Sequence, residues 1–440
     1  LFSCVAAERG FPVVMGSKQY LYAVAPRYKR SIFIAKSMRK SASLIFRILR
    51  DLGNDIVAWD EESLVRYSSP EYYSWRFSEG TFEPLSHLFS WGEDDREMFL
   101  KYPGIGGTQV HATGNPRADL LRADVRNYFA DEKHRLIDRY GSFILVNTNF
   151  PFVNPFVKKL ALVSAPDANA KRSVSRTGSG MSQEFAEGMS EHAQQIFDHF
   201  TQLMPSLASW FPDHKIIIRP HPSEDHEVWR EQLKGHDNVE VIHEGNAVPW
   251  LMASRVLLHN GCTTAVEAAA LGVPAVTYQP VQAQSFDYDL PNSVSRQALT
   301  EEDVRVQIQA ALDGEEGKPS AQEIEQILSR HLASPTGPLG SDRIIDILSQ
   351  SDRLGAQAGS LFGPRYVMAY LRSHARATIK RLNGLRQDHW NSARYHSQRF
   401  PDISAAEINN RIGRFAKVLG RFDGVHATHI SQHVFRIERT

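Results

Sequence analysis

Residues 214–280 read HKIIIRPHPSEDHEVWREQLKGHDNVEVIHEGNAVPWLMASRVLLHNGCTTAVEAAALGVPAVTYQP, and this stretch decides the fold. Short runs rich in Val, Ile and Leu alternate in it with segments of helical length. The pattern predicts strands at Lys215–Arg219, Val239–His243, Val256–His259 and Ala275–Tyr278, each followed by a helix. Because parallel neighbours need crossover connections, the pattern indicates a parallel sheet with helices on both faces.

The flanking sequence extends this pattern. Phe143–Asn147 is predicted as a further strand of the same sheet, and Ser164–Ser190, which has no clear period, as a mobile loop. A second α/β unit is predicted in front, with strands at Phe11–Gly16, Ile32–Ala35, Ile56–Trp59 and Gln109–Ala112. Because Leu1–Gly10 looks like the back half of a helix, we expect an initial strand to be missing.

The length of 440 residues indicates two domains with an appendage, since domains typically hold roughly 100 to 200 residues. The fold class predicted is α/β, with two Rossmann-like parallel-sheet domains and a helical C-terminal extension. The predicted boundaries are 1–122 for the front domain, 123–140 for a linker helix, 141–350 for the second domain and 351–440 for the extension.

Composition excludes several classes of protein. Lys+Arg and Asp+Glu both number 50, so no global charge favours nucleic acid as a partner. Cys4 and Cys262 are too few for a disulfide framework, which favours a reducing compartment. No apolar stretch approaches the roughly 20 residues that cross a bilayer, and no signal peptide opens the chain. The expected location is the cytoplasm.

The segment from Arg365 to Arg399 is strongly basic, with eight Lys or Arg residues and one acid, Asp388. Its apolar residues Val367, Leu371, Ile379, Leu382 and Leu385 predict a helical stripe. One interpretation is a helix packed on the body with a solvated basic face. The other is attraction to anionic lipid or to a lipid-linked acceptor, which would attach the chain peripherally to the inner membrane.

Polar residues follow the predicted strands of the second domain at their carboxyl ends, where ligands bind in open parallel sheets. The residues expected to bind a ligand there are Asn147, Thr148, Asn149, Arg219, His221, Glu244, His259, Gly261, Thr263, Thr264 and Glu267. Thr263 and Thr264 follow a glycine turn at a helix start, where hydroxyls and backbone N–H groups can hold a phosphate. Alternatively, Thr264 and Glu267 form a capping box.

His221 lies between two prolines, which deny it helical geometry and hold its ring at the strand mouth. There it is expected to donate to a phosphate or to a leaving nucleotide. The ordinary alternative is a surface or capping side chain. Arg219 and His259 on neighbouring loops favour the functional interpretation. Cys262 is interpreted as a small buried residue, because nothing nearby marks a base for it.

At these residues the chain resembles the bacterial surface carbohydrate biosynthesis protein family and, more distantly, the capsule-type β-Kdo transferases of two-domain GT-B architecture. Further segments that look like the family's recurrent ones are Trp59–Val65, Ser90–Glu93, Thr113–Arg117 and Ile144–Asn149. The resemblance covers nearly the whole chain. It implies a GT-B-like fold, with two domains facing a cleft, and a glycosyltransferase of bacterial surface polysaccharide (capsule or LPS-type) synthesis.

The HP dipeptide followed by paired hydroxyl residues is also similar to that of CMP-sialic acid transferases and CDP-glycerol polymer transferases. The implied donor is a CMP- or CDP-activated polyol or sugar, with a Kdo-like sugar as one candidate, and the acceptor is a saccharide or a lipid-linked saccharide. On this analogy His221 faces the phosphate, Thr263 and Thr264 bind it, and Glu267 takes the ribose hydroxyls. Neither a metal nor another cofactor is expected, because Arg219, His221 and a helix end can stabilise the leaving phosphate.

The acidic run Asp60-Glu61-Glu62 ends a predicted strand of the front domain. Glycosyl transfer needs a carboxylate opposite the donor, as base or as nucleophile, so these three residues and His221 are the catalytic candidates. The alternative is a solvated acidic turn that caps the next helix. Two further hypotheses for the whole chain are a UDP-sugar 2-epimerase of the same architecture and a non-catalytic assembly protein that binds nucleotide.

Overall fold

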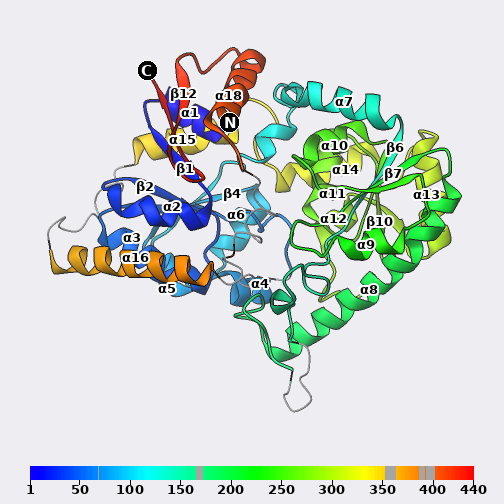
Figure 1. The fold of residues 1–440 in the computed structure, drawn as a ribbon, viewed down its shortest axis with the longest axis horizontal. Coiled ribbons are helices and arrows are strands. Elements are labelled where there is room, and N and C mark those ends of the chain that lie inside the picture. Colours follow the sequence, from blue (N-terminus) through cyan, green and yellow to red (C-terminus); the bar gives the residue numbers. More distant parts are fainter. Residues whose placement is uncertain (68, 165–171, 352–362, 386–391, 393–401) are drawn as a thin grey trace. The chain divides into compact units, whose positions relative to one another are not determined.

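The computed structural model of the chain describes residues 1–67, 69–164, 172–351, 363–385, 392 and 402–440. The chain forms two compact units (Figure 1). Unit 1 comprises Leu1–Ser63, Arg76–Tyr128 and Arg330–Thr440, and unit 2 comprises Leu64–Trp75 and Phe129–Ser329. The division differs from the predicted boundaries, because residues 330–440 return to unit 1 and residues 64–75 join unit 2.

Unit 2 is built on a six-stranded parallel sheet, here called sheet C. Its strands in chain order are β6 (Phe143–Asn147), β7 (Lys215–Arg219), β8 (Val239–Val241), β9 (Val256–His259), β10 (Ala275–Tyr278) and β11 (Arg296–Ala298). In space the order is β8-β7-β6-β9-β10-β11. The four strands predicted from residues 214–280, and the predicted strand Phe143–Asn147, are all present, whereas β11 had no sequence prediction.

Helices cover both faces of sheet C. One core contains Ile144 and Val146 of β6 with residues of α8 (Gln183–Trp210), α9 (Glu227–Gln232) and α13 (Glu301–Leu312). The other contains Phe143 and Leu145 with residues of α7 (Ala130–Tyr140), α10 (Ala247–Ala253) and α11 (Thr263–Leu271). Because alternate residues of a strand point to opposite faces, one short strand anchors both layers.

Unit 1 contains a four-stranded parallel sheet, here called sheet B, in the order β2-β3-β4-β5. The strands are β2 (Ile32–Ala35), β3 (Asp55–Trp59), β4 (Leu85–Ser90) and β5 (Gln109–Ala112). The helices described in unit 1 include α2 (Lys18–Val24), α3 (Ser43–Asp51), α5 (Glu79–Phe82), α6 (Glu93–Leu100), α15 (Gly340–Gln350), α16 (Pro364–Asn383) and α18 (Ala405–Leu419), and α4 (Ser69–Arg76) runs into it from unit 2. The α/β fold class with two Rossmann-like parallel sheets is confirmed.

A small antiparallel sheet corrects two predictions. The predicted first strand of the front unit forms β1 (Val13–Gly16), which pairs with β13 (Val434–Arg439) and not with sheet B. β13 also pairs with β12 (Val425–Ser431), so the segment after residue 351 is not wholly helical. Sequence reasoning also missed β4, as it missed β11, β12 and β13; β4 is buried along its whole length and shows no alternation of polar and apolar residues.

Other predicted elements shift in extent. Leu1–Gly10 contains α1 (Phe2–Glu8), as its pattern indicated. The long helix α8 begins at Gln183, inside the predicted loop Ser164–Ser190, and residues 165–171 of that loop lie outside the described residues. The predicted linker helix is the shorter α7. Of the basic segment 365–399, the structure describes 365–385 and 392, which include most of α16.

Candidate nucleotide site

The strand order of sheet C reverses direction between β6 and β9. From β6 the chain proceeds outward to β7 and β8, and from β9 it proceeds in the opposite direction to β10 and β11. The loops after β6 and β9 therefore diverge from a crevice at the carboxyl edge, which is where open α/β sheets bind ligands. Sheet B contains no such reversal among its four strands.

Two asparagines bridge the loops at this switch point. The Asn149 backbone N–H donates to Asn260 Oδ1 at 2.8 Å, and Asn260 Nδ2 donates to the Asn149 carbonyl at 3.3 Å. Asn149 Nδ2 also donates to the Gly261 carbonyl at 3.2 Å. The predicted Asn149 and Gly261 are thus brought together, and the bonds fix the spacing of the two loops.

A glycine turn then starts helix α11. Gly261 has φ of +83°, which L side chains rarely adopt. A Cβ at Gly261 would lie 3.1 Å from Tyr288 Cδ2, so the backbone also needs the missing side chain. The turn directs the N-terminal N–H groups of α11 toward the carboxyl edge of the sheet, and such groups attract anions.

The capping box predicted for Thr264 and Glu267 does not form. The N-cap of α11 is Cys262, its side chain makes no cap hydrogen bond, and both Thr263 and Thr264 lie inside the helix. Cys262 Sγ instead lies 2.6 Å from Thr264 Oγ1, and burial raises the pKa of the Cys262 thiol. Thr263 and Thr264 are partly exposed, whereas Glu267 is buried within α11.

His259 supports the turn from inside the sheet. Its Nδ1 accepts from the Gly261 N–H at 3.0 Å, so in the neutral ring Nε2 carries the proton and donates to Ser295 Oγ at 2.9 Å. Burial lowers the pKa of His259 to about 3, which keeps the ring neutral. Both ring nitrogens of His259 are bonded to other protein atoms. The role that fits His259 is therefore to position Gly261, in place of the predicted direct contact with a ligand.

Sequence reasoning missed the residue that organises the HP loop, Glu224. Its carboxylate is wholly buried and accepts from His221 N–H at 3.1 Å, from Phe150 N–H at 2.9 Å, from Thr148 Oγ1 at 3.0 Å and from Trp229 Nε1 at 3.1 Å. Burial raises the pKa of Glu224 to about 7 although these donors oppose the shift. The predicted Thr148 is therefore a support of this carboxylate.

The orientation of His221 follows from its bonds. Its Nδ1 accepts from the Ser223 N–H at 3.1 Å, which places the proton of the neutral ring on Nε2. Its carbonyl accepts from His226 Nε2 at 3.2 Å, and the adjacent Pro220 carbonyl contacts His243 Nδ1 at 3.0 Å. Unlike His259, His221 is partly exposed. Its Nε2–H is thus a donor held on a fixed loop.

Arg219 lies beneath the same loop. Its Nη1 donates to the Glu244 carbonyl at 2.7 Å, and its guanidinium stacks 4.8 Å from the centroid of the Trp250 ring. Burial lowers the pKa of Arg219 to about 10, so the group stays charged at neutral pH. Arg219 therefore holds the loop at Glu244 through a backbone carbonyl. It also places a buried positive charge two residues before His221. Asn147 lies buried at the end of β6.

Residues 64–75 approach the switch point from within unit 2. Tyr67 Oη and Tyr288 Oη form a hydrogen bond, and burial raises the pKa of Tyr67. Tyr67 belongs to an aromatic cluster to which Trp75, Phe185 and Phe286 contribute. The turn at Gly261 is thus covered through Tyr288 by a segment 200 positions away, for which the sequence carried no periodic signal.

The three predicted catalytic carboxylates of unit 1 are in different environments. Asp60 is wholly buried and ion-paired with Arg76, which excludes it from contact with an acceptor. Glu61 Oε1 accepts from Trp59 Nε1 at 2.8 Å. Glu62 is exposed. Of the three predicted carboxylates, Asp60 is thus buried in an ion pair and Glu62 is the exposed one.

The segments Ser90–Glu93 and Thr113–Arg117 also have structural roles in unit 1. A Cβ at Gly92 would lie 2.4 Å from the Arg330 carbonyl oxygen, and one at Gly114, where φ is +85°, would lie 2.8 Å from the Ala333 carbonyl oxygen. Both glycines therefore allow residues 330–334 to pack closely. These recurrent segments support the frame of the unit.

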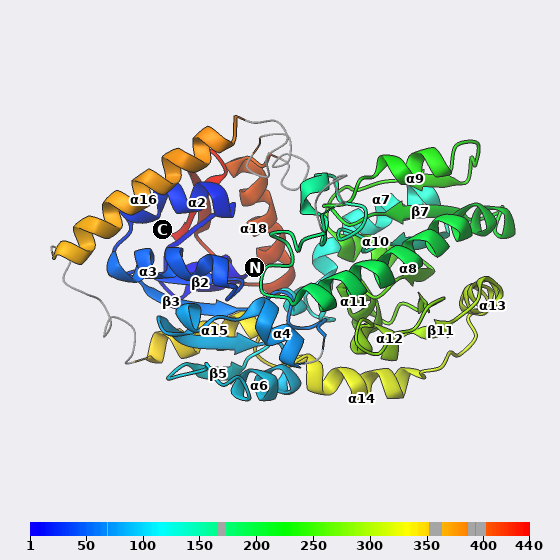
Figure 2. The same cartoon turned by 90° about the horizontal axis from the view of Figure 1, so that it is seen from below.

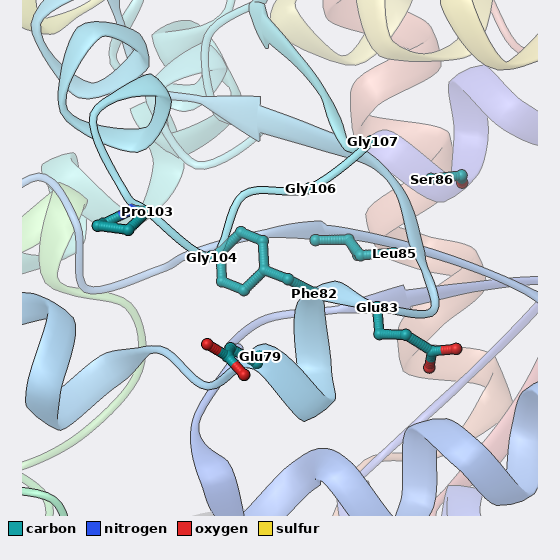
Figure 3. Close-up of a pocket in the computed structure, with 9 residues that line it drawn as sticks. All are labelled: Glu79, Phe82, Glu83, Leu85, Ser86, Pro103, Gly104, Gly106 and Gly107. Atoms are coloured by element: carbon teal, nitrogen blue, oxygen red, sulfur yellow. The ribbon is translucent and has the colours of Figure 1, made fainter.

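A hollow of about 470 Å³ lies elsewhere in unit 1 (Figure 3). It is lined by Glu79, Phe82, Glu83, Leu85, Ser86, Pro103, Gly104, Gly106 and Gly107. Leu85 begins β4 and the glycine loop precedes β5, so the hollow is at the amino edge of sheet B. Parallel sheets bind ligands at the opposite edge. The hollow is therefore not the candidate site.

No helix in the described ranges is long and apolar enough to cross a membrane. No three His, Cys, Asp or Glu side chains within those ranges are grouped so that they could hold a metal ion.

The sequence matches no family model and no curated protein. Among solved structures it is similar to UDP-GlcNAc 2-epimerase from Methanocaldococcus jannaschii, with TM-score 0.43 and 14% identity over 73% of this chain and 77% of that one. It is also similar to the wall teichoic acid polymerase TagF, with TM-score 0.41 and 11% identity over 70% of each chain. A third is Anabaena Alr3699/HepE in complex with UDP and glucose, with TM-score 0.37 and 14% identity over 76% and 80%.

Proposed function

We propose that the chain is a glycosyltransferase that binds a nucleotide-activated sugar at the β6–β9 switch point of unit 2. The observation that carries the proposal is the reversal of strand order, where the Asn149–Asn260 bridge and the glycine turn of α11 meet. A nucleotide sugar suits this crevice because its phosphates are anionic and the helix start supplies N–H donors.

In this proposal Thr263 and the first N–H groups of α11 hold the phosphate. The Nε2–H of His221 donates to the leaving phosphate, whose negative charge grows as the glycosidic bond breaks. Arg219 adds positive charge from below without contacting the ligand. Glu267 keeps its predicted role at the ribose hydroxyls, which needs the ligand to approach a buried carboxylate.

The acceptor side is proposed for unit 1, with Glu62 as the carboxylate that takes the acceptor proton or attacks the anomeric carbon. This narrows the predicted trio, because Asp60 is buried and Glu61 is engaged by Trp59. The cytidine donor, a Kdo-like sugar, a lipid-linked acceptor and a cytoplasmic location in a bacterium remain predictions from the sequence.

Calorimetric titration with CMP, CDP and UDP tests whether the site binds a nucleotide and which nucleobase it prefers. We expect a preference for the cytidine nucleotides and a loss of affinity of about tenfold in His221→Ala, which is roughly one charge-assisted hydrogen bond. His134→Ala, an exposed histidine on α7, is the matched control and should bind like the wild type. Equal weak binding of all three nucleotides to wild type and variant would contradict the proposal.

Product analysis tests the reaction. With a nucleotide sugar and extracted lipid-linked saccharides, we expect release of the nucleotide and a glycosylated product. Glu62→Gln should abolish turnover and leave the Kd for the nucleotide unchanged, while Glu61→Gln should retain activity. If the protein instead interconverts UDP-GlcNAc and its 2-epimer with no acceptor present, it is an epimerase and the transferase proposal fails.

A further inference from the structure

Helix α16 of unit 1 packs with its polar side inward. It lies along α3 and α2, as Figure 2 shows for the orange helix beside the two blue ones. The residues of α16 that are themselves buried are Ala369 and Ser373. Arg376 and Lys380 reach inward to the Tyr22 ring, with their cationic groups 5.9 and 5.0 Å from its centroid. An ordinary surface helix buries its apolar stripe, so this arrangement is reversed.

The apolar side chains of α16 and the following turn face away from the unit. They are between 42% and 78% exposed, and they are Val367, Met368, Tyr370, Leu371, Ile379, Leu382 and Leu385. Val367 and Leu371 are four residues apart, and Leu371 and Leu382 are eleven apart, so the helical period gathers these aliphatic residues into one stripe. From Val367 to Leu382 this stripe spans roughly 22 Å at a rise of about 1.5 Å per residue.

The charges around the stripe are all positive. Between residues 363 and 385 there are five Lys or Arg residues and no Asp or Glu. By the helical period Arg365 and Arg372 border the stripe on one side and Arg381 borders it on the other. An apolar face with cationic borders is the arrangement of helices that lie in the plane of a membrane interface.

The elements under α16 carry the same sign of charge. Residues 9–50, which contain α2 and all of α3 except its last residue, Asp51, hold ten Lys or Arg residues and no Asp or Glu. Among them Lys29 lies 4.9 Å from the centroid of the Tyr366 ring on α16. The formal net charge of the chain is zero, so the rest of the chain is net acidic and the positive charge is concentrated here.

We propose that α16 docks unit 1 on an anionic lipid surface, with Val367, Leu371 and Leu382 entering the interface and the bordering arginines contacting the headgroups. Charge attraction was expected from sequence, but the structure adds an apolar face turned outward. Anionic lipid is the favoured occupant because it complements both the apolar stripe and the unbroken positive charge. A second copy is disfavoured, because a two-fold pairing of α16 would oppose like charges.

Sedimentation of the full chain with vesicles tests the proposal. We expect binding to phosphatidylcholine vesicles that contain phosphatidylglycerol, weak binding to pure phosphatidylcholine, and release by salt. Leu371→Ser with Leu382→Ser should weaken binding at least tenfold, since each side chain leaves an apolar environment. The matched control is Val306→Ser with Ile137→Ser, two exposed apolar residues on helices of unit 2, which should bind like the wild type.

A charge variant separates the two contributions. Arg365→Gln with Arg372→Gln should weaken binding to the anionic vesicles by about tenfold or more and flatten its salt dependence, because each cation near such a surface contributes about fivefold. Thermal unfolding of each variant checks that the fold is kept. The proposal is overturned if folded leucine and arginine variants bind as the wild type does, or if the wild type binds no vesicle. It is equally overturned if the leucine variant only abolishes self-association or binding to a protein.

Discussion

Sheets B and C arise from the same alternation of strands and helices, yet only sheet C has, among its described strands, the reversal of order at which we propose a ligand site. In sheet B the spatial order follows the chain from β2 to β5, and its carboxyl edge is filled by the buried Asp60–Arg76 pair. In sheet C the order reverses at β6 and β9, and the two loops are held apart and bridged. The comparison teaches that strand order, which local patterns do not reveal, decides which edge can bind a ligand.

The largest expected effect on stability comes from breaking the Asp60–Arg76 ion pair at the carboxyl edge of sheet B. Asp60→Asn leaves Arg76 buried without its counter-charge, so the free energy of unfolding should fall by about 3 to 5 kcal/mol. The Kd for nucleotide should stay unchanged in the folded variant. Urea unfolding and calorimetry measure the two quantities. Glu83→Gln, which removes the partly exposed ion pair with Arg50, is the control and should cost less than about 1 kcal/mol.

The opposite result would reverse the comparison. If Asp60→Asn unfolded like the wild type but no longer bound nucleotide, the carboxyl edge of sheet B would be a binding edge too, and the assignment of Asp60 to the frame of unit 1 would be wrong.

The next effect concerns Glu224 under sheet C and depends on pH. Its folded pKa of about 7 lies above the ordinary value of 4.5, so its contribution to stability is full below pH 4.5 and is lost as the pH rises through 7. The loss amounts to about 3 kcal/mol. Glu224→Gln does not titrate, so the stability difference between wild type and variant should shrink or change sign over this range.

Denaturant unfolding of both proteins from pH 4.5 to pH 8 gives this difference. Because His243 and His259 titrate in both proteins, their contributions cancel in the subtraction. A difference that stays constant with pH would mean that the donors from His221, Phe150 and Trp229 keep the carboxylate ionised throughout.

The smallest expected effect on stability comes from alanine substitutions at the two glycines that flank α11. The two substitutions should differ in their effect on nucleotide binding. Gly261 and Gly272 have φ of +83° and +73°, so alanine at either position should cost about 1 kcal/mol in unfolding free energy. Only at Gly261 would the new methyl group crowd Tyr288, because nothing lies within 4 Å of a Cβ at Gly272. Calorimetry should show nucleotide binding weakened about tenfold in Gly261→Ala alone. Equal binding by the two variants would separate the turn from the site.

Local pattern predicted most of sheet C because its strands are short β-branched runs bounded by Pro, Gly and Asn. It failed at β4, where burial on both faces removes the alternation, and at β1, whose partner β13 lies more than 400 positions away. The candidate site was predicted as a set of loops. It could not be divided into ligand contacts and supports, because that division depends on which side chains bond inward, as His259 and Arg219 do.

Glu224 shows why the burial of a residue is hard to predict from the local sequence. A glutamate five residues after a strand resembles an exposed helix start, and only the arrival of Phe150 and Trp229 from distant segments makes it a buried acceptor. Asp60 shows the reverse case, in which an acidic run that suggested catalysis conceals a residue required by the interior of unit 1.

The pairing of β1 with β13 constrains the order in which parts of the protein can fold during synthesis. Val13 lies opposite Ile437, so this sheet cannot be completed before residue 437 has been synthesised. Unit 2 is nearly continuous and has all its residues once Ser329 has been made. During translation unit 2, which holds the candidate site, can therefore fold before β1 meets its partner, and a chain that lacked Val434–Arg439 would leave β1 without the strand it pairs with.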